Sequence, residues 1–113
     1  MRIIEKPWGQ EEVIELNEHY MMKKLTMWKD KRCSLQLHNL KKETIFVISG
    51  LLKIISGPDE DNLKEKIYSA GDFITISPKT IHRMEGVEDC VYLEASTPEM
   101  DDVVRLKDDY DRA

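Results

Sequence analysis

The sequence predicts an all-β fold, either a barrel or a sandwich of short strands. Short segments rich in isoleucine and valine recur along the chain between turn signals, which is the pattern of a many-stranded β domain. No segment keeps the period of an amphipathic helix, apart from one candidate helical turn at residues 100–106. Because the 113 residues contain no repeat and no linker, one domain is predicted, residues 1–113.

Turn residues separate eight predicted strands. In chain order these strands are residues 13–16, 21–28, 34–39, 44–49, 51–56, 66–69, 72–77 and 90–95. A polar turn at 17–18 and a charged run at 29–32 follow the first two strands. Residues 40–42 are predicted to form a hairpin connection between the third strand and the fourth. Glycine and proline mark the edges of several later strands.

The C-terminal segment, residues 99–113, is acidic but carries Val103, Val104 and Leu106. These apolar side chains give it enough surface to pack, so we expect the segment to dock against the body. The alternative is a solvated acidic tail.

Composition excludes several classes of function. Charged residues make up 35% of the chain and the net charge is −5, which argues against a broad nucleic-acid interface. No apolar run approaches the roughly 20 residues of a membrane helix, and the N-terminus turns polar too early for a leader peptide. The two cysteines, Cys33 and Cys90, lack metal or redox spacing and are expected to be packed, unreactive thiols of a cytoplasmic protein.

Four polar residues form a candidate metal site. Gln36 and His38 are two apart in a predicted strand and therefore share a face, and Glu43 begins the next strand. His82 follows a predicted turn far downstream. In a barrel these side chains can converge, and an amide oxygen, two imidazoles and a carboxylate suit Zn, Mn, Fe, Ni or Co with positions left open. The alternative is that the histidines are hydrogen-bonded structural residues.

The spacing of these residues resembles the two motifs of the cupin family. The first motif corresponds to Gln36, His38, Glu43 and Gly50. The second corresponds to Gly71, Asp72, Pro78 and His82. Gln36 stands where most cupins have the first histidine. The resemblance implies a cupin double-stranded β-helix, or jelly-roll barrel, with a short C-terminal extension.

One branch of that family is similar along most of the chain. KPWG at 6–9, Lys23, SLQLH at 34–38 and DDVVRLKDDYDR at 101–112 resemble the cupin domain of type II mannose-6-phosphate isomerases. In those proteins the domain usually follows a nucleotidyltransferase domain, so this chain resembles a stand-alone version. The departures are Lys41 for an arginine, Ile45 for an aromatic residue and Asp111 for a glycine.

The resemblance implies a metal-dependent aldose–ketose isomerase acting on a sugar phosphate such as mannose-6-phosphate. Under this interpretation Glu94 is the candidate base and Lys23 binds a hydroxyl or the phosphate. Arg105, Arg112 and Lys41 are candidate substrate-binding residues, although a lysine at position 41 lacks the planar fork of arginine.

Each of these residues also has a structural interpretation. Glu94 can be a charge-paired strand residue and Lys23 an exposed strand lysine. Arg105 and Arg112 can pair with the nearby carboxylates. Those carboxylates are Asp101, Asp102, Asp108 and Asp109.

Two other functions remain open from the sequence. One is a non-catalytic cupin that binds metal or sugar, since cupins have many functions. The other is an iron-dependent cupin dioxygenase, against which Gln36 in place of a histidine counts. The expected partners are a small sugar or sugar phosphate and a second copy of the chain, with no nucleic acid and no membrane. The homodimer is expected from family likeness and from exposed sheet edges.

Overall fold

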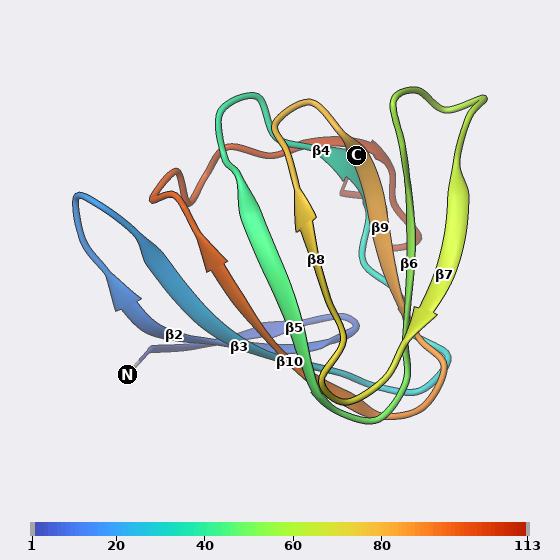
Figure 1. Cartoon of the computed structure of the whole chain (residues 1–113), viewed down its shortest axis with the longest axis horizontal. Coiled ribbons are helices and arrows are strands. Elements are labelled where there is room, and N and C mark those ends of the chain that lie inside the picture. The colour runs from blue at the N-terminus through green and yellow to red at the C-terminus, as the bar shows by residue number, and fades with distance from the viewer. Residues whose placement is uncertain (1, 113) are drawn as a thin grey trace.

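The computed structural model describes residues 2–112, which form eleven β-strands (Figure 1). The strands are β1 (Arg2–Lys6), β2 (Gly9–Leu16), β3 (Met21–Met27), β4 (Leu35–Leu37), β5 (Glu43–Ser49), β6 (Leu52–Gly57), β7 (Lys64–Tyr68), β8 (Phe73–Ile76), β9 (Ile81–Gly86), β10 (Cys90–Ser96) and β11 (Val104–Lys107). The all-β prediction is therefore confirmed. Within this part of the chain there is no helix long and apolar enough to span a membrane.

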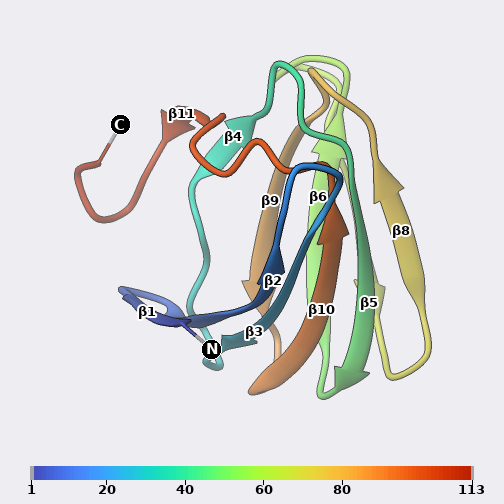
Figure 2. The same ribbon diagram turned by 90° about the vertical axis from the view of Figure 1, so that its left-hand side faces the viewer.

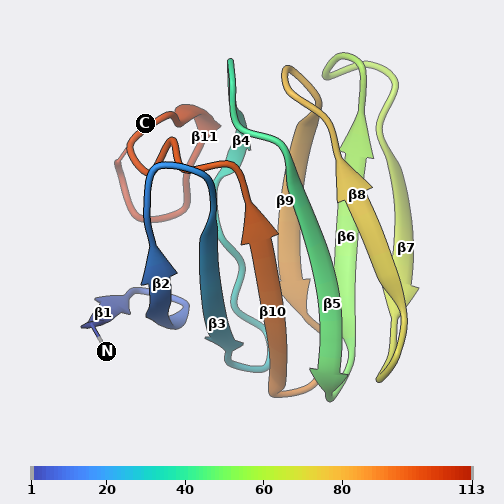
Figure 3. The same cartoon turned by 60° about the vertical axis from the view of Figure 1, so that its left-hand side comes forward.

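The strands form two antiparallel sheets that lie face to face (Figure 3). One sheet has the order β1-β2-β3-β10-β5-β8, and the other has the order β11-β4-β9-β6-β7. Strands distant in sequence are neighbours in both sheets, as in a jelly roll rather than in a simple meander.

Alternating residues place the core between the sheets. In β3 every second residue is buried, from Met21 through Lys23 and Leu25 to Met27, while the residues between them are only partly covered. The same alternation buries Ile45 and Val47 of β5. Apolar residues fill most of this interior, but Lys23 is buried at a core position, so the interior also contains a polar region.

Cys33 and Cys90 are buried free thiols. Burial raises the pKa of each thiol to about 11, which keeps both protonated and unreactive near neutral pH. The prediction of two packed thiols is confirmed.

The hairpin predicted at residues 40–42 is wrong. β4 pairs with β9 and β11, whereas β5 pairs with β10 and β8, so residues 38–42 cross from one sheet to the other. The apolar pattern correctly located the two strands, but it contains no information about which partner each strand takes. This crossover brings residues of both sheets to one end of the interior.

Three strands were not predicted. β1 and β11 are short edge strands, and the helical turn proposed near residues 100–106 is wrong because residues 104–107 pair with β4. β9 lacks the usual alternation because its first four residues are all buried. The outward-facing Arg83 is covered by the chain itself, since it donates hydrogen bonds to the carbonyls of Cys33 and Lys107.

The C-terminal segment docks against the body, as predicted (Figure 2). Besides the β11–β4 pairing, Arg32 binds Asp109 through two hydrogen bonds of 2.6 and 3.0 Å. Tyr110 packs against the apolar core. The segment is therefore part of the folded domain.

Gly50 joins β5 to β6 in a conformation that excludes other residues. Its φ is +79°, and a Cβ atom there would lie 2.1 Å from the carbonyl oxygen of Asp89. Only glycine meets both conditions, which accounts for its place in the first motif.

Candidate metal centre

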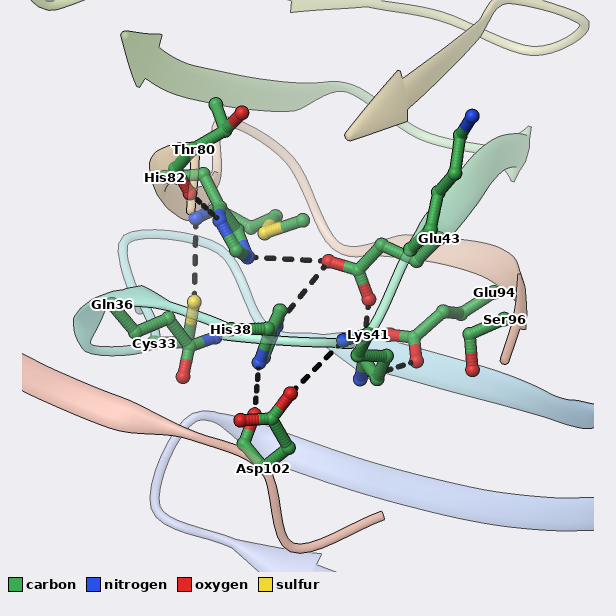
Figure 4. A network of polar contacts seen from close by, with 12 residues as sticks. Cys33, Gln36, His38, Lys41, Glu43, Thr80, His82, Glu94, Ser96 and Asp102 are labelled. Carbon is green, nitrogen blue, oxygen red and sulfur yellow. Dashed lines mark hydrogen bonds and ion pairs between the residues drawn. The ribbon is translucent and has the colours of Figure 1, made fainter. Parts of the chain in front are cut away.

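Three predicted ligands converge at one end of the interior (Figure 4). Glu43 Oε1 lies 3.2 Å from Nε2 of His82 and 3.6 Å from Nε2 of His38. All three side chains are buried, and His82 is 0% exposed. Glu43 comes from the six-stranded sheet, whereas His82 lies on β9 and His38 directly follows β4 in the other sheet.

Backbone carbonyls fix the tautomer of both histidines. His38 Nδ1 lies 2.5 Å from the carbonyl oxygen of Asp102, and His82 Nδ1 lies 3.0 Å from that of Thr80. A carbonyl oxygen can only accept, so each Nδ1 carries a proton. In the neutral rings both Nε2 lone pairs therefore point towards Glu43, as in histidines that bind metal through Nε2.

These residues fit a metal ion. Without positive charge among them, the two lone pairs and the carboxylate oxygen would repel one another. The two ring centroids are only 5.0 Å apart, so two positively charged rings would repel each other. One divalent cation would satisfy all three groups. His82 Nε2 is buried and, among residues 2–112, has no hydrogen-bond partner, as expected of a nitrogen available to a metal.

Glu43 is held ionised by its neighbours. Burial by itself would raise its pKa, but the positive charge of Lys41, whose Nζ lies 3.3 Å from Glu43 Oε2, lowers the pKa. An ionised carboxylate is the form that binds a metal.

Gln36 lies beside this cluster. Its Cα is paired with that of His82 across β4 and β9, and its side chain lines the same cavity as His38 and Glu43. Ser34 Oγ donates a 3.2 Å hydrogen bond to the amide oxygen of Gln36. Because an amide oxygen has two lone pairs, one remains for a metal. Ligation by Gln36 stays a prediction.

Asp102 organises the loop that carries His38, and the sequence analysis missed this role. Its carboxylate accepts hydrogen bonds from the backbone N–H groups of Asn39, Leu40 and Lys41 at 3.1, 2.7 and 2.9 Å. Its carbonyl oxygen accepts the hydrogen bond from His38. In the sequence, Asp102 stood out only as part of the DDVVRLKDDYDR segment at 101–112 and as a possible partner for arginines.

A buried ion-pair chain lies next to the candidate ligands. Lys41 Nζ is 3.0 Å from Glu94 Oε2 and 3.3 Å from Glu43 Oε2. Burial, followed by the charge of Glu43, raises the pKa of Glu94 to about 7. Burial would lower the pKa of Lys41, but Glu94 and Glu43 together raise it. Glu94 is thus charge-paired, as its structural interpretation predicted. The structural interpretation of Lys23 as an exposed lysine is wrong, because Lys23 is buried and its Nζ lies 3.2 Å from Glu11 Oε2.

A cavity of about 420 Å³ is lined by Gln36, His38 and Glu43, although not by His82, and by most of the predicted substrate-binding residues. Lys23, Lys41, Glu94 and Arg105 line it. Arg112 is not among its lining residues, because Asp108 holds its guanidinium through two hydrogen bonds of 2.9 Å. Pairing with a nearby carboxylate, the alternative to substrate binding, therefore holds for Arg112. Arg105 forms no ion pair among residues 2–112.

Comparison with models of known protein families shows to which family this chain belongs. The family model described as "Mannose-6-phosphate isomerase C-terminal" matches residues 1–108. The chain belongs to this family. Membership in the mannose-6-phosphate isomerase C-terminal family confirms the resemblance found in the sequence.

Curated relatives of this family member are longer proteins. This chain is 28% identical over 114 residues to mannose-1-phosphate guanylyltransferase 2 of Escherichia coli O157:H7, and the match covers 96% of this chain and 23% of the relative. It is also 28% identical to the guanylyltransferase ManC of Salmonella typhimurium, covering 98% and 23%. The chain thus spans about a quarter of the length of the curated relatives it matches.

Solved structures confirm the cupin fold of this family member. KdgF from Halomonas sp. superposes with a TM-score of 0.78 at 15% identity, covering 90% of this chain and 92% of KdgF. CapF, a capsular polysaccharide assembling protein from Staphylococcus aureus, gives 0.81 at 17% identity, covering 94% and 34%. Oxalate decarboxylase from Bacillus subtilis, in a study of its Mn(II) centres, gives 0.80 at 19% identity, covering 94% and 30%. These similarities establish the fold and not the reaction.

Proposed function

We propose that this cupin domain is a metal-dependent aldose–ketose isomerase acting on a sugar phosphate of the mannose-6-phosphate type. The observation that carries the proposal is the cluster of His38, Glu43 and His82, of which His38 and Glu43 line one cavity together with the Lys41–Glu94 pair. Such an isomerase needs a Lewis acid and a group that takes and returns a proton. Family membership supports the choice of sugar phosphate.

His38, Glu43 and His82, with Gln36, would hold the metal. When bound, a divalent ion supplies electrophilic stabilisation of negative charge that develops on a substrate oxygen. Two imidazoles and oxygen ligands suit Mn, Zn, Fe, Ni or Co. Manganese is one option to test first, because the structurally similar oxalate decarboxylase of Bacillus subtilis has Mn(II) centres.

Glu94 would transfer the proton. The reaction removes a proton from the carbon next to the carbonyl and delivers a proton to the former carbonyl carbon. The buried Glu94 carboxylate lies on the wall of the cavity and can perform both transfers. Lys41 holds that carboxylate in place with a 3.0 Å hydrogen bond. Lys23, paired with Glu11 on the same wall, would orient a substrate hydroxyl.

The test is turnover by the purified chain. Metal-free protein is supplied separately with each of the five ions and assayed for conversion of fructose-6-phosphate to mannose-6-phosphate and of related pairs. We expect turnover with at least one ion and none with His82→Ala. Full metal occupancy with no conversion across the panel would refute the isomerase.

A non-catalytic sugar-binding cupin is the second candidate function. It is favoured by the Lys41–Glu94 contact, because a carboxylate engaged by a lysine is less available as a base. Under this alternative, sugar phosphates would raise the thermal midpoint of metal-loaded protein without being converted.

A further inference from the structure

A tyrosine on β10 lines the cavity and has no role in the proposed chemistry. Tyr92 lies on the cavity wall, as does the candidate base Glu94 on the same strand. β10 lies between β3 and β5 within the six-stranded sheet (Figure 3). A side chain on such an inner strand is supported by neighbours on both sides.

The alternation of β10 points Tyr92 and Glu94 in the same direction. Positions 90, 92, 94 and 96 of this strand are buried, whereas the three positions between them are more accessible. Residues two apart in a strand share a face and are separated by about 7 Å. Tyr92 and Glu94 therefore project side by side into the interior.

The core holds the ring of Tyr92 in place. The Cα partners of Tyr92 are Leu25 on β3 and Val47 on β5, and both are buried. Tyr92 itself is 2% exposed and belongs to the same apolar core. Leu25 also lines the cavity, so the cavity extends to this level of the sheet. Packing thus sets the position of the phenol ring before any ligand binds.

The hydroxyl of Tyr92 lacks a partner in the protein. Within residues 2–112 it forms no hydrogen bond, although buried tyrosine hydroxyls usually find a partner. In the same part of the chain, the fully enclosed side-chain atoms without a partner belong to Glu43, His82, Glu99 and Arg105. The Tyr92 hydroxyl is therefore not enclosed but open to the cavity. A hydroxyl of a ligand would satisfy it.

This hydroxyl keeps its proton. Burial raises the pKa of Tyr92 well above its ordinary value, and the nearby Glu94 carboxylate raises it further. A neutral phenol can donate one hydrogen bond and also accept one. A sugar hydroxyl, which is likewise neutral and both donates and accepts, is a suitable partner.

We propose that Tyr92 is a further substrate-binding residue, whose hydroxyl forms a hydrogen bond with a sugar hydroxyl beyond the two reacting carbons. The inference rests on the proposed function and deepens it. Because Tyr92 is displaced about 7 Å along β10 from Glu94, a sugar with its reacting carbons at Glu94 extends a later hydroxyl towards Tyr92. The contact fixes the reacting carbons against Glu94 and selects sugars that carry this hydroxyl.

Calorimetric titration of the full chain with fructose-6-phosphate, in the presence of the metal ion that it binds most tightly, tests the contact. Tyr92→Phe keeps the ring and removes only the hydroxyl. We expect it to weaken binding about 3- to 10-fold, the usual effect of losing one hydrogen bond. Tyr68→Phe is the matched control, because Tyr68 is also buried but does not line the cavity, and it should bind like wild type.

Analogues of fructose-6-phosphate that each lack one hydroxyl identify the group that Tyr92 contacts. One analogue should bind to the wild type about 3- to 10-fold more weakly than fructose-6-phosphate does. Tyr92→Phe should bind this analogue and fructose-6-phosphate equally well, because the partner of the missing hydroxyl is already absent. A Tyr92→Phe variant that discriminates as strongly as the wild type would contradict the contact.

Thermal unfolding without ligand separates a ligand contact from a structural role. Tyr92→Phe should unfold at the wild-type temperature or above it, because the variant removes a donor that has no partner in the protein. The contact is overturned if Tyr92→Phe binds fructose-6-phosphate as tightly as Tyr68→Phe, if its only effect is a lower thermal midpoint, or if the wild type does not bind the sugar. Binding is measured without turnover, so a chain that shows these effects but converts no sugar refutes the isomerase and retains the contact.

Discussion

At the residue scale, backbone oxygens determine what the two histidines can do. The carbonyls of Asp102 and Thr80 occupy both Nδ1 atoms, so only Nε2 remains for a ligand. Rotating either ring would leave a buried N–H without an acceptor. The site is therefore prepared for a cation by parts of the chain that do not bind one.

Asp102→Asn should weaken metal binding about 10- to 100-fold, the usual effect of losing a group that orients a ligand. The amide cannot replace a carboxylate that accepts three N–H bonds, so the loop carrying His38 should become less ordered. Metal affinity measured by competition with a chelator checks this. Asp101→Asn is the matched control, and equal affinities in the two variants would count against the role of Asp102.

Glu94→Gln should reduce turnover by about 100-fold or more while leaving bound metal unchanged. The amide keeps the shape of Glu94 but cannot accept the transferred proton. Elemental analysis and initial rates on the same sample separate the two effects. Glu88→Gln, at an exposed position, is the control. A fully active Glu94→Gln enzyme would show that the base lies elsewhere.

Spacing and family likeness predicted His38, Glu43 and His82 from the sequence, and the structure brings them together. Asp102 could not be predicted in the same way. It acts on the backbone N–H groups of a loop more than 60 residues away, and backbone groups leave no residue-specific signal. The pairing of Arg112 with Asp108 was foreseen only as an alternative.

At the scale of elements, strand positions were more predictable than strand partners. Alternation located β3, β5 and β10 closely, because each has one buried face. β9 was missed because its residues are buried on both faces, which removes the alternation. The connection at 38–42 was mistaken for a hairpin because a hairpin turn and a crossover between two sheets can both be short and polar.

Asp108→Asn should destabilise the C-terminal segment by about 1 kcal/mol at neutral pH, allowing for solvent screening of the pair. The side-chain hydrogen bond from Arg112 is the largest cause that lowers the pKa of Asp108, which falls to about 2. A lowered folded-state pKa gives stability that is present above the unfolded-state pKa and is lost as the pH falls.

Urea unfolding of the wild type and of Asp108→Asn, measured at a series of pH values, checks this loss of stability. The difference in unfolding free energy should be constant above about pH 4 and should shrink as the pH falls towards 2. A difference independent of pH would show that the ion pair is not its source.

At the scale of the whole molecule, a metal ion would link the two sheets. Glu43 belongs to the six-stranded sheet, and His82 belongs to the five-stranded one. Saturating metal, at about 100 times its dissociation constant, should stabilise the fold by about 2.7 kcal/mol and raise the thermal midpoint by roughly 10 °C or more. Glu43→Gln should abolish most of that rise in calorimetry. An equal rise in this variant would place the binding elsewhere.

The homodimer and the cytoplasmic location stay predictions. Exposed Phe46 and Phe73 are neighbours on the outer face of β5 and β8, with 43% and 68% of their surfaces accessible. Apolar surface of this kind is often covered by a partner. Light scattering coupled to gel filtration should give twice the 13.2 kDa chain mass. A 13.2 kDa particle at micromolar concentration would contradict the dimer.

The most direct test of the whole account is calorimetric titration of metal-free protein with divalent ions. Wild type and His19→Ala, which alters an exposed histidine outside the cluster, should each bind one ion per chain. His82→Ala should bind the same ion about 100-fold more weakly or not at all. Stoichiometric binding by His82→Ala with wild-type affinity would contradict the metal centre and, with it, the isomerase.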